Sequence, residues 1–154
     1  MKALLCTSYG PASGLEFSEI DNPQLSEDQV LIDVSHCGLN FPDTLTIQGK
    51  DQYGPPMPFS PGGEFSGTVA EIGSAVDHLQ VGDRVLAGTI WGGLREKAVA
   101  SAYNVHKIPD SMEFETASVF IVTYGTAYHC LVDRTRLQPG ETVAVLGAAG
   151  GIGL

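Results

Sequence analysis

The glycine-rich stretch Gly147–Gly153 carries the most specific chemistry in the sequence. It follows the apolar run Val143–Leu146, which predicts a buried strand. Aligned on its last two glycines, the dinucleotide-binding pattern G-x-G-x-x-G places Ala148, Gly150 and Gly153 at the three glycine positions. Backbone N–H groups there would bind a pyrophosphate at the start of a helix. Because Ala148 replaces the first glycine, a plain strand-to-helix turn is the alternative. The predicted cofactor contacts in the loop are Ala149, Gly150, Gly151, Ile152 and Gly153.

The histidines and cysteines do not have the spacing of a metal site or a disulfide framework. The three cysteines are odd in number and far apart in the sequence. His36 and Cys37 are neighbours, so on a strand they would point to opposite faces. No two histidines stand at ligand spacing. We therefore predict no bound metal, and we interpret the histidines as surface or satisfied polar residues: His36, His78, His106 and His129.

The composition excludes several classes of partner. The net charge of −10 would repel nucleic acid and anionic membranes. The N-terminus is not typical of a signal peptide, and no apolar run approaches the ~20 residues of a membrane span. We expect a cytoplasmic protein whose partner is a small molecule.

The elements that must position this chemistry fall into two parts. Up to residue 109 the pattern is of short strands joined by Gly/Pro turns, typical of an antiparallel barrel or sandwich. In the clearest strand, Val30, Ile32 and Val34 share one face, with the polar residues Asp33 and Ser35 on the other. A short helix is predicted after Asn40, with Pro42 in its first turn and Gly49 at its end.

After Pro109 the pattern changes to long apolar segments. Met112–Leu131 predicts helix, and Gly125 is expected to divide it in two. The strand Val143–Leu146 would then belong to a parallel sheet covered on both faces. We predict two domains, residues 1–112 and 113–154.

Five stretches, in order, resemble one known family. They are HCGLNFPDTLTIQG, PFSPGGEFSG, VGDRV, TYGTAYHCL and GAAGGIG, beginning at residues 36, 58, 81, 123 and 147. Their order is similar to that of the medium-chain dehydrogenases/reductases, and most of all to the zinc-independent NADPH:quinone oxidoreductase branch, the zeta-crystallin-like proteins. The resemblance implies a mixed β and α/β fold: a GroES-like β-barrel domain followed by the truncated start of a Rossmann domain. The family's Rossmann domain continues further, so the chain is expected to be an N-terminal half with little activity of its own.

The resemblance also implies roles for particular residues. Asn40, Asp43 and Tyr53 match family residues that line the pocket near the nicotinamide, and Thr123 matches a threonine close to it. Zinc-dependent relatives have Cys and His where this sequence has Asn40 and Gly63. From the residues alone, Asn40 is equally a helix cap, Asp43 a partner of the helix dipole, Tyr53 a loop anchor and Thr123 part of a helix break. Glu64 is interpreted as structural.

The predicted function is hydride transfer from NADPH to a quinone or related enone, whose conjugation spreads the incoming charge without a metal. The same scaffold also suits an enoyl or haloacrylate-type reductase. If 154 residues is the natural length, a non-catalytic binding module is the alternative from another class. A homodimer or other homo-oligomer is expected, because an unpaired apolar strand favours association.

Overall fold

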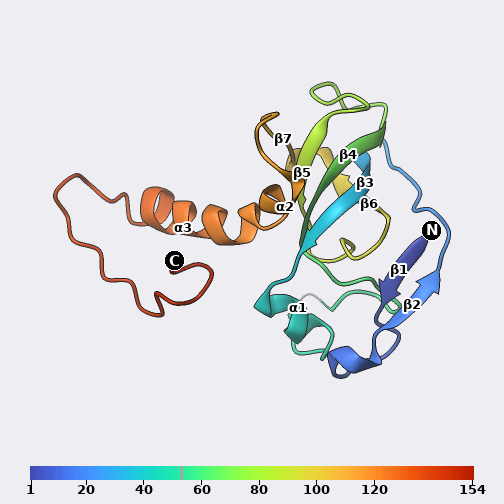
Figure 1. Cartoon of the computed structure of the whole chain (residues 1–154), viewed down its shortest axis with the longest axis horizontal. Helices are drawn as coiled ribbons and strands as arrows, with labels where there is room; N and C mark the ends of the chain where they lie inside the picture. Colours follow the sequence, from blue (N-terminus) through green and yellow to red (C-terminus); the bar gives the residue numbers. More distant parts are fainter. Residues whose placement is uncertain (53) are drawn as a thin grey trace.

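The computed structural model describes residues 1–52 and 54–154, and most of its regular structure is antiparallel β-sheet (Figure 1). One sheet has five strands in the order β6-β3-β4-β5-β7, and a second pairs β1 with β2. The strands are β1 Lys2–Leu5, β2 Glu16–Glu19, β3 Gln29–Gly38, β4 Glu64–Ile72, β5 Arg84–Gly88, β6 Lys97–Ser101 and β7 Val105–Lys107. The predicted antiparallel architecture is confirmed, and the short edge strand β7 was not predicted.

The alternation in β3 builds the main core. Val30 and Ile32 are fully buried and pair in register with Ile72 and Val69 of β4. Phe65 is the largest fully buried side chain of this core. Alternate residues of a strand point to the same face of the sheet, so the apolar residues at every second position of β3 are buried together in one core, as the sequence pattern predicted.

Two isolated bridges, Ala3 with Arg95 and Cys6 with Phe59, join the β1 segment to the loops before β6 and β4. Cys6 and Phe59 also form a second buried cluster together with Ile47. These contacts hold Phe59, in the segment before β4, against the rest of the barrel.

Helix α1 (Phe41–Thr46) begins where the sequence predicted it. Asn40 has extended backbone dihedrals at the N-cap position, and its N–H donates to Asp43 Oδ2 over 2.8 Å. Gly49 follows the helix with φ +67°, a left-handed conformation that favours glycine. The predicted start and end of this helix are therefore confirmed.

Gly49→Ala is expected to lower the free energy of unfolding by about 1–2 kcal/mol. An added Cβ would keep the unfavourable φ and lie 2.9 Å from Cγ of Tyr9. Gly10→Ala is the matched control, because nothing lies within 4 Å of its Cβ position. Urea unfolding of both variants tests this, and equal stabilities would contradict the assigned role of Gly49.

A helical arm leaves the barrel after residue 113 (Figure 1). Arg84 fixes its start: the guanidinium donates to the carbonyl oxygens of Pro109, Asp110 and Met112 and lies 4.6 Å from the ring centroid of Phe114. The arm contains α2 (Phe114–Ala117), η3 (Ile121–Gly125), α3 (Thr126–Tyr128) and η4 (His129–Arg134), of which η3 and η4 have the wider π-type turns.

The predicted division of this segment at Gly125 is wrong. Gly125 has helical dihedrals, φ −62° and ψ −42°, and η3 continues into α3 through it. The regular helix is interrupted earlier, after α2, where the Ser118 hydroxyl donates to the Glu115 carbonyl. A side chain that competes for a helical carbonyl disturbs the regular turn there, whereas glycine only lowers helix propensity by about 1 kcal/mol.

The strand predicted at Val143–Leu146 is not formed. Val143–Val145 have no regular secondary structure, Leu146 lies in a turn, and Leu146 is 96% exposed. A strand of a parallel sheet needs neighbouring strands for its hydrogen bonds and covering helices for its side chains. No described residue after position 107 belongs to a strand, so these requirements are not met. The mostly β part of the predicted fold is confirmed, and the start of a Rossmann sheet is not seen.

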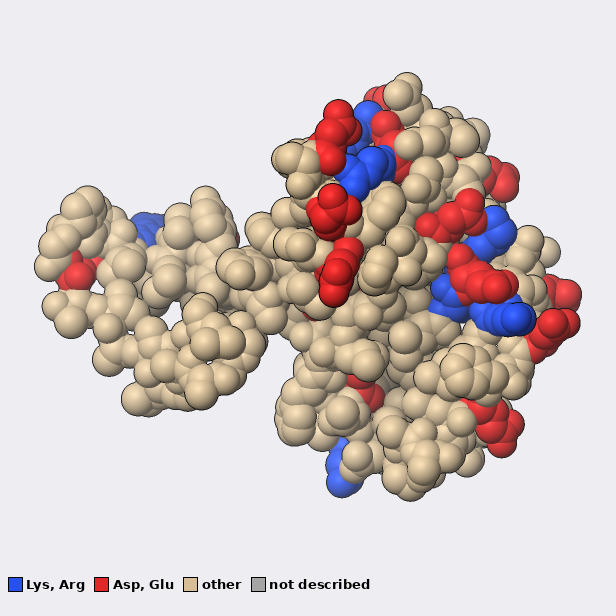
Figure 2. Space-filling model, in the orientation of Figure 1, with Lys and Arg blue, Asp and Glu red and all other residues tan. Residues whose placement is uncertain are grey.

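Charged side chains gather on the barrel, while the arm and the final segment are mostly uncharged on the face shown in Figure 2. Several large apolar side chains of the arm and final segment are exposed, among them Tyr124, Tyr128 and Val145. Among the described residues, no helix has the length and apolar character needed to cross a membrane.

Candidate functional site

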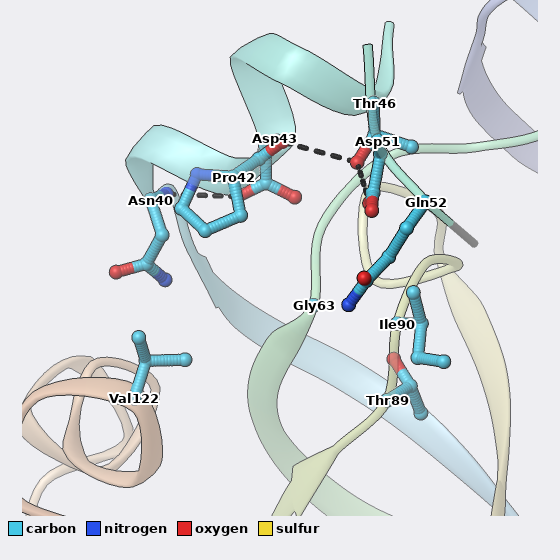
Figure 3. Close-up of a pocket in the computed structure, with 10 residues that line it drawn as sticks. All are labelled: Asn40, Pro42, Asp43, Thr46, Asp51, Gln52, Gly63, Thr89, Ile90 and Val122. Atoms are coloured by element: carbon cyan, nitrogen blue, oxygen red, sulfur yellow. Dashed lines mark hydrogen bonds between the residues drawn. The ribbon is translucent and has the colours of Figure 1, made fainter. Parts of the chain in front are cut away.

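A cavity of about 370 Å³ lies between α1, the start of β4 and the helical arm (Figure 3). This volume is in the range of small-molecule sites. Segments far apart in the sequence contribute to its wall: Asn40, Pro42, Asp43 and Thr46 around α1, Asp51, Gln52, Gly63, Thr89 and Ile90 from loops, and Val122 from η3. The structure therefore brings Asn40 and Asp43 together in one cavity, as the family resemblance implied. Tyr53 lies outside the described residues.

Asp43 acts as a backbone clamp beside this cavity. Its Oδ2 accepts the N–H of Asn40 at 2.8 Å, and its Oδ1 accepts the N–H of Gly62 at 3.1 Å. The carboxylate thus joins the first turn of α1 to the loop before β4, and it lies at a helix start where negative charge is favourable. Both oxygens have partners, so Asp43 can hold the cavity wall in place.

Glu64 connects the barrel to the helical arm. It is only 1% exposed, its Oε1 accepts Asn40 Nδ2 at 2.8 Å, and its Oε2 accepts the N–H of Val122 at 3.0 Å. A buried carboxylate is retained only when hydrogen bonds compensate the loss of water. The interpretation of Glu64 as structural is consistent with these bonds. The side chain that donates to it, Asn40, belongs to the cavity wall. Glu64 therefore orients Asn40.

Several residues of the cavity wall were not predicted as site residues. The Thr46 hydroxyl lies 2.7 Å from Asp51 Oδ2 and 3.0 Å from the Pro42 carbonyl oxygen. Thr89 Oγ1 is buried and has no hydrogen-bond partner in the described part of the chain. Thr46 follows Asp43 by three residues, a spacing that places both on one face of a helix and could have identified it. Thr89 and Val122 are brought in by the tertiary fold, and no local pattern indicates them.

The two positions at which zinc-dependent relatives have Cys and His, Asn40 and Gly63, both line the cavity. Neither a carboxamide nor a glycine is a usual zinc ligand. No group of three or more His, Cys, Asp or Glu that could hold a metal ion occurs within residues 1–52 and 54–154. The side chains around this cavity therefore do not fit a catalytic zinc.

Cys37 lies near the carboxylates of Asp43 and Glu64 and has an unreactive thiol. Burial, and to a smaller extent the nearby carboxylates of Asp43 and Glu64, together raise its pKa to about 12. At pH 8 a thiol of this pKa is ionised to only about 1 part in 10,000. The interpretation of Cys37 as an apolar filler agrees with this, because thiolate is the nucleophilic form.

Alkylation with iodoacetamide at pH 8 is expected to modify the exposed Cys130 first and to leave Cys37 unmodified in the folded protein. The rate at Cys37 should rise about tenfold per pH unit between pH 8 and pH 11, since the thiolate fraction rises in that proportion below the pKa. Peptide mass spectrometry measures each site, and unfolding in urea should remove the difference. Fast labelling of Cys37 at pH 8 would contradict the assignment.

The glycine loop forms a series of turns near the helical arm. Gly150 N–H donates to Gly147 O at 2.9 Å, and Leu154 N–H donates to Gly150 O at 3.1 Å, the spacing of one α-helical turn. A Cβ on Gly151 would lie 3.4 Å from Thr123 Cγ2, and one on Gly153 would lie 2.5 Å from the Gly147 carbonyl oxygen.

Two features of the loop fit a dinucleotide phosphate. Gly150, Gly151 and Gly153 have no side chains that could cover the loop backbone. Thr123 lies beside Gly151, so the two sets of residues predicted to contact the cofactor, Thr123 and the glycine loop, are neighbours. The buried strand that would hold the loop is not formed, so the fit is local to the loop and Thr123.

The whole chain is similar to known proteins. Residues 26–110 match the family model described as the alcohol dehydrogenase GroES-like domain. The chain is 39% identical to quinone oxidoreductase-like protein 2 of Mus musculus over 153 residues, which are 99% of this chain and 43% of that protein. The chain thus spans less than half the length of this relative.

Two solved structures extend the comparison. The human synaptic vesicle membrane protein VAT-1 homolog-like protein superposes with a TM-score of 0.95 at 34% identity, over 99% of this chain and 50% of the other. The mycobacterial protein Rv1454c, solved in complex with NADPH, superposes with a TM-score of 0.91 at 32% identity, over 99% of this chain and 47% of the other.

Proposed function

We propose that this chain, which belongs to the alcohol dehydrogenase GroES-like family in the quinone oxidoreductase-like branch of the medium-chain dehydrogenases/reductases, provides the acceptor side of an NADPH-dependent reductase of quinones or related enones. The observation that carries the proposal is the Asn40 amide at the cavity wall, held by the buried Glu64. The full activity belongs to a protein longer than this chain, because the relative it matches is more than twice as long.

Asn40 is the group that would contact the acceptor. An amide NH₂ has two donors, and Glu64 accepts only one of them in the structure. The other hydrogen can donate to a carbonyl oxygen in the cavity, where negative charge grows as the quinone or enone is reduced. A donor already oriented by a buried carboxylate needs no reorganisation to stabilise that charge.

Asp43 would keep Asn40 in place by holding its backbone N–H, and Val122 would close the cavity on the side of the helical arm. Tyr53 stays a prediction as a further donor. The uncharged walls supplied by Pro42, Ile90 and Val122 suit a flat, conjugated acceptor better than a charged one.

NADPH would supply the hydride when bound. The residues that would hold it are Thr123 and the backbone of Ala149, Gly150, Gly151, Ile152 and Gly153. N–H groups of such a loop bind phosphate oxygens without needing a side chain. Those of Gly150 and Gly153 donate to the carbonyl oxygens of Gly147 and Gly150 in this structure, so phosphate binding would require them to exchange these bonds. The choice of NADPH over NADH is part of the proposal and rests on the relative solved with NADPH.

The proposal is tested by the intact mass of the native protein and by its turnover. We expect a mass well above 16.2 kDa and NADPH oxidation that depends on an added quinone, whereas the 154-residue chain alone should show little or no turnover. A full-length protein that oxidises NADPH with neither quinones nor enones would contradict the proposal. Turnover with an enoyl thioester and none with quinones would favour the enoyl-reductase alternative.

Asn40→Ala in the full-length protein is expected to lower kcat for quinone reduction by about 10²-fold, the cost of losing one preorganised donor. The change should appear in kcat more than in KM, because the bond strengthens as negative charge develops. Thr44→Ala, on the exposed side of α1, is the control and should retain the parent activity. An unchanged kcat in Asn40→Ala would assign the residue to helix capping alone.

Self-association remains a proposal as well. Exposed apolar side chains on the arm and final segment, including Tyr124, Val145 and Leu146, support a homodimer or other homo-oligomer. Light scattering of the chain over a range of concentrations would determine its assembly state.

A further inference from the structure

A second cavity, of about 460 Å³, shares the Thr89–Ile90 loop with the Asn40 cavity. The loop lines both cavities. The side chains of interest in the second one are Gln24, Gln29, Trp91, Arg95, Ser101 and Asn104. None of the proposed steps of hydride transfer uses this cavity.

Arg95 is a half-buried cation without a carboxylate partner in the part of the chain that the structure describes. Its Nε donates to the Gly92 carbonyl oxygen at 2.6 Å, which uses one of five N–H donors. By contrast, Lys97 pairs with Asp33 and Lys107 with Asp83. Burial lowers the pKa of Arg95, because removal from water disfavours the charged form. An unpaired, partly desolvated guanidinium gains from an anion more than a fully hydrated one does.

The backbone around Arg95 is shaped to place this group. Gly92 has φ +109°, and a Cβ there would lie 2.3 Å from Nη2 of Arg95. The guanidinium therefore occupies space that only a glycine at position 92 leaves open. A second Arg95 contact, the bridge of its backbone with Ala3, fixes the strand segment that carries it.

The other side chains of this cavity complement an organic anion. Within the described residues no Asp or Glu lines the cavity, although the chain is strongly acidic overall. Gln24, Asn104 and Ser101 can donate hydrogen bonds to oxygen atoms. Trp91 offers a large apolar surface on the same wall, which suits a flat carbon skeleton attached to the charged group.

We infer that Arg95 and Trp91 form a binding site for an organic carboxylate, with the guanidinium binding the carboxylate and the indole packing against its apolar body. A guanidinium has the planar geometry that matches two carboxylate oxygens at once. The site is separate from the Asn40 cavity and does not depend on the proposed reductase activity.

Trp91 provides the test, because it is the only tryptophan of the chain and lines this cavity. Its fluorescence is titrated with sodium benzoate at constant ionic strength, using the 154-residue chain. We expect a saturable change with benzoate and none with benzamide, its neutral analogue, at the same concentrations. Arg95→Gln should weaken benzoate binding by about tenfold or more. Arg95→Lys should weaken it by less, because lysine keeps the positive charge but lacks the paired planar N–H donors of the guanidinium.

Lys97→Gln is the matched control: it removes the same charge from a residue paired with Asp33 outside the cavity, and it should leave the titration unchanged. Circular dichroism and urea unfolding verify that each variant is folded. The inference is overturned if folded Arg95→Gln and Arg95→Lys both bind benzoate like the parent chain. It is also overturned if benzamide binds equally well, or if inorganic phosphate saturates the signal and benzoate does not. None of these measurements requires NADPH or turnover, so failure here leaves the reductase proposal to its own test.

Discussion

Replacing Glu64 with alanine is expected to lower the free energy of unfolding by about 4 kcal/mol. The carboxylate is 1% exposed and accepts Asn40 Nδ2 and the N–H of Val122. Alanine would leave both donors without an acceptor in a buried place, at about 1–3 kcal/mol each, and would open a cavity where the side chain lay. Urea unfolding followed by circular dichroism measures the loss.

Glu64→Gln separates the hydrogen bonds from the volume. Glutamine fills the same space but has one acceptor, so it can accept from Val122 only if Asn40 turns its amide oxygen toward the new NH₂ group. We expect a smaller loss, about 1–2 kcal/mol. In the full-length reductase the turned Asn40 amide should also reduce kcat, although the protein remains folded.

A double-mutant cycle of Glu64→Gln with Asn40→Ala tests the contact directly. Residues that share a hydrogen bond give coupling energies of about 0.5–3 kcal/mol, whereas independent residues give values near zero. Additive effects of the two substitutions would show that Glu64 does not act through Asn40. A near-neutral Glu64→Ala would show that the buried carboxylate is not needed by the fold.

The sequence was sufficient to predict elements whose pattern is local. β3 follows from the alternation of Val30, Ile32 and Val34, because one face of a strand must be buried. α1 follows from Asn40, Pro42 and Gly49, each of which has its expected place at a helix end. Such signals depend on the backbone of a few neighbouring residues, and tertiary contacts only reinforce them.

One failed prediction concerns an element that needs distant partners, and the other concerns a local signal. Val143–Leu146 has the composition of a buried strand, but its stability would come from neighbouring strands and covering helices, and it is exposed here. Gly125 was expected to divide the helical segment in two, yet glycine in a helix costs only about 1 kcal/mol, which the surrounding turns can offset.

The candidate site shows the same distinction. Asn40 and Asp43 were identified through motifs and do line one cavity, whereas Thr89 and Val122 reach it only because the tertiary fold brings the segment after β5 and the helical arm to the same cavity. The Glu64 contacts join positions 24 and 58 residues away in the sequence. No periodicity or spacing can reveal a bond of that kind, so Glu64 was expected to be structural without its link to Asn40 being seen.

Gly67→Ala is expected to destabilise the chain by about 4 kcal/mol or to prevent folding. A Cβ at this position would lie 2.0 Å from the backbone oxygen of Asp33, a contact that no side-chain rotation can relieve. Gly67 pairs with Val34 in β3 at a point where the register shifts before His36, so the two backbones approach closely there. Relief would require β3 and β4 to separate.

The consequence of that separation reaches the candidate site. β3 leads to Asn40 and β4 begins with Glu64, so a displaced pair of strands would move apart Asn40 of the cavity wall and the Glu64 carboxylate that holds it. Gly88→Ala in the adjacent β5 is the matched control, because its Cβ would meet only the Ile121 side chain at 3.4 Å, an ordinary contact. Urea unfolding should show a change below about 1 kcal/mol for Gly88→Ala and a large loss for Gly67→Ala. Equal stabilities would mean that β3 and β4 can shift without cost, and the shared strand pair could not then be what holds Asn40 against Glu64.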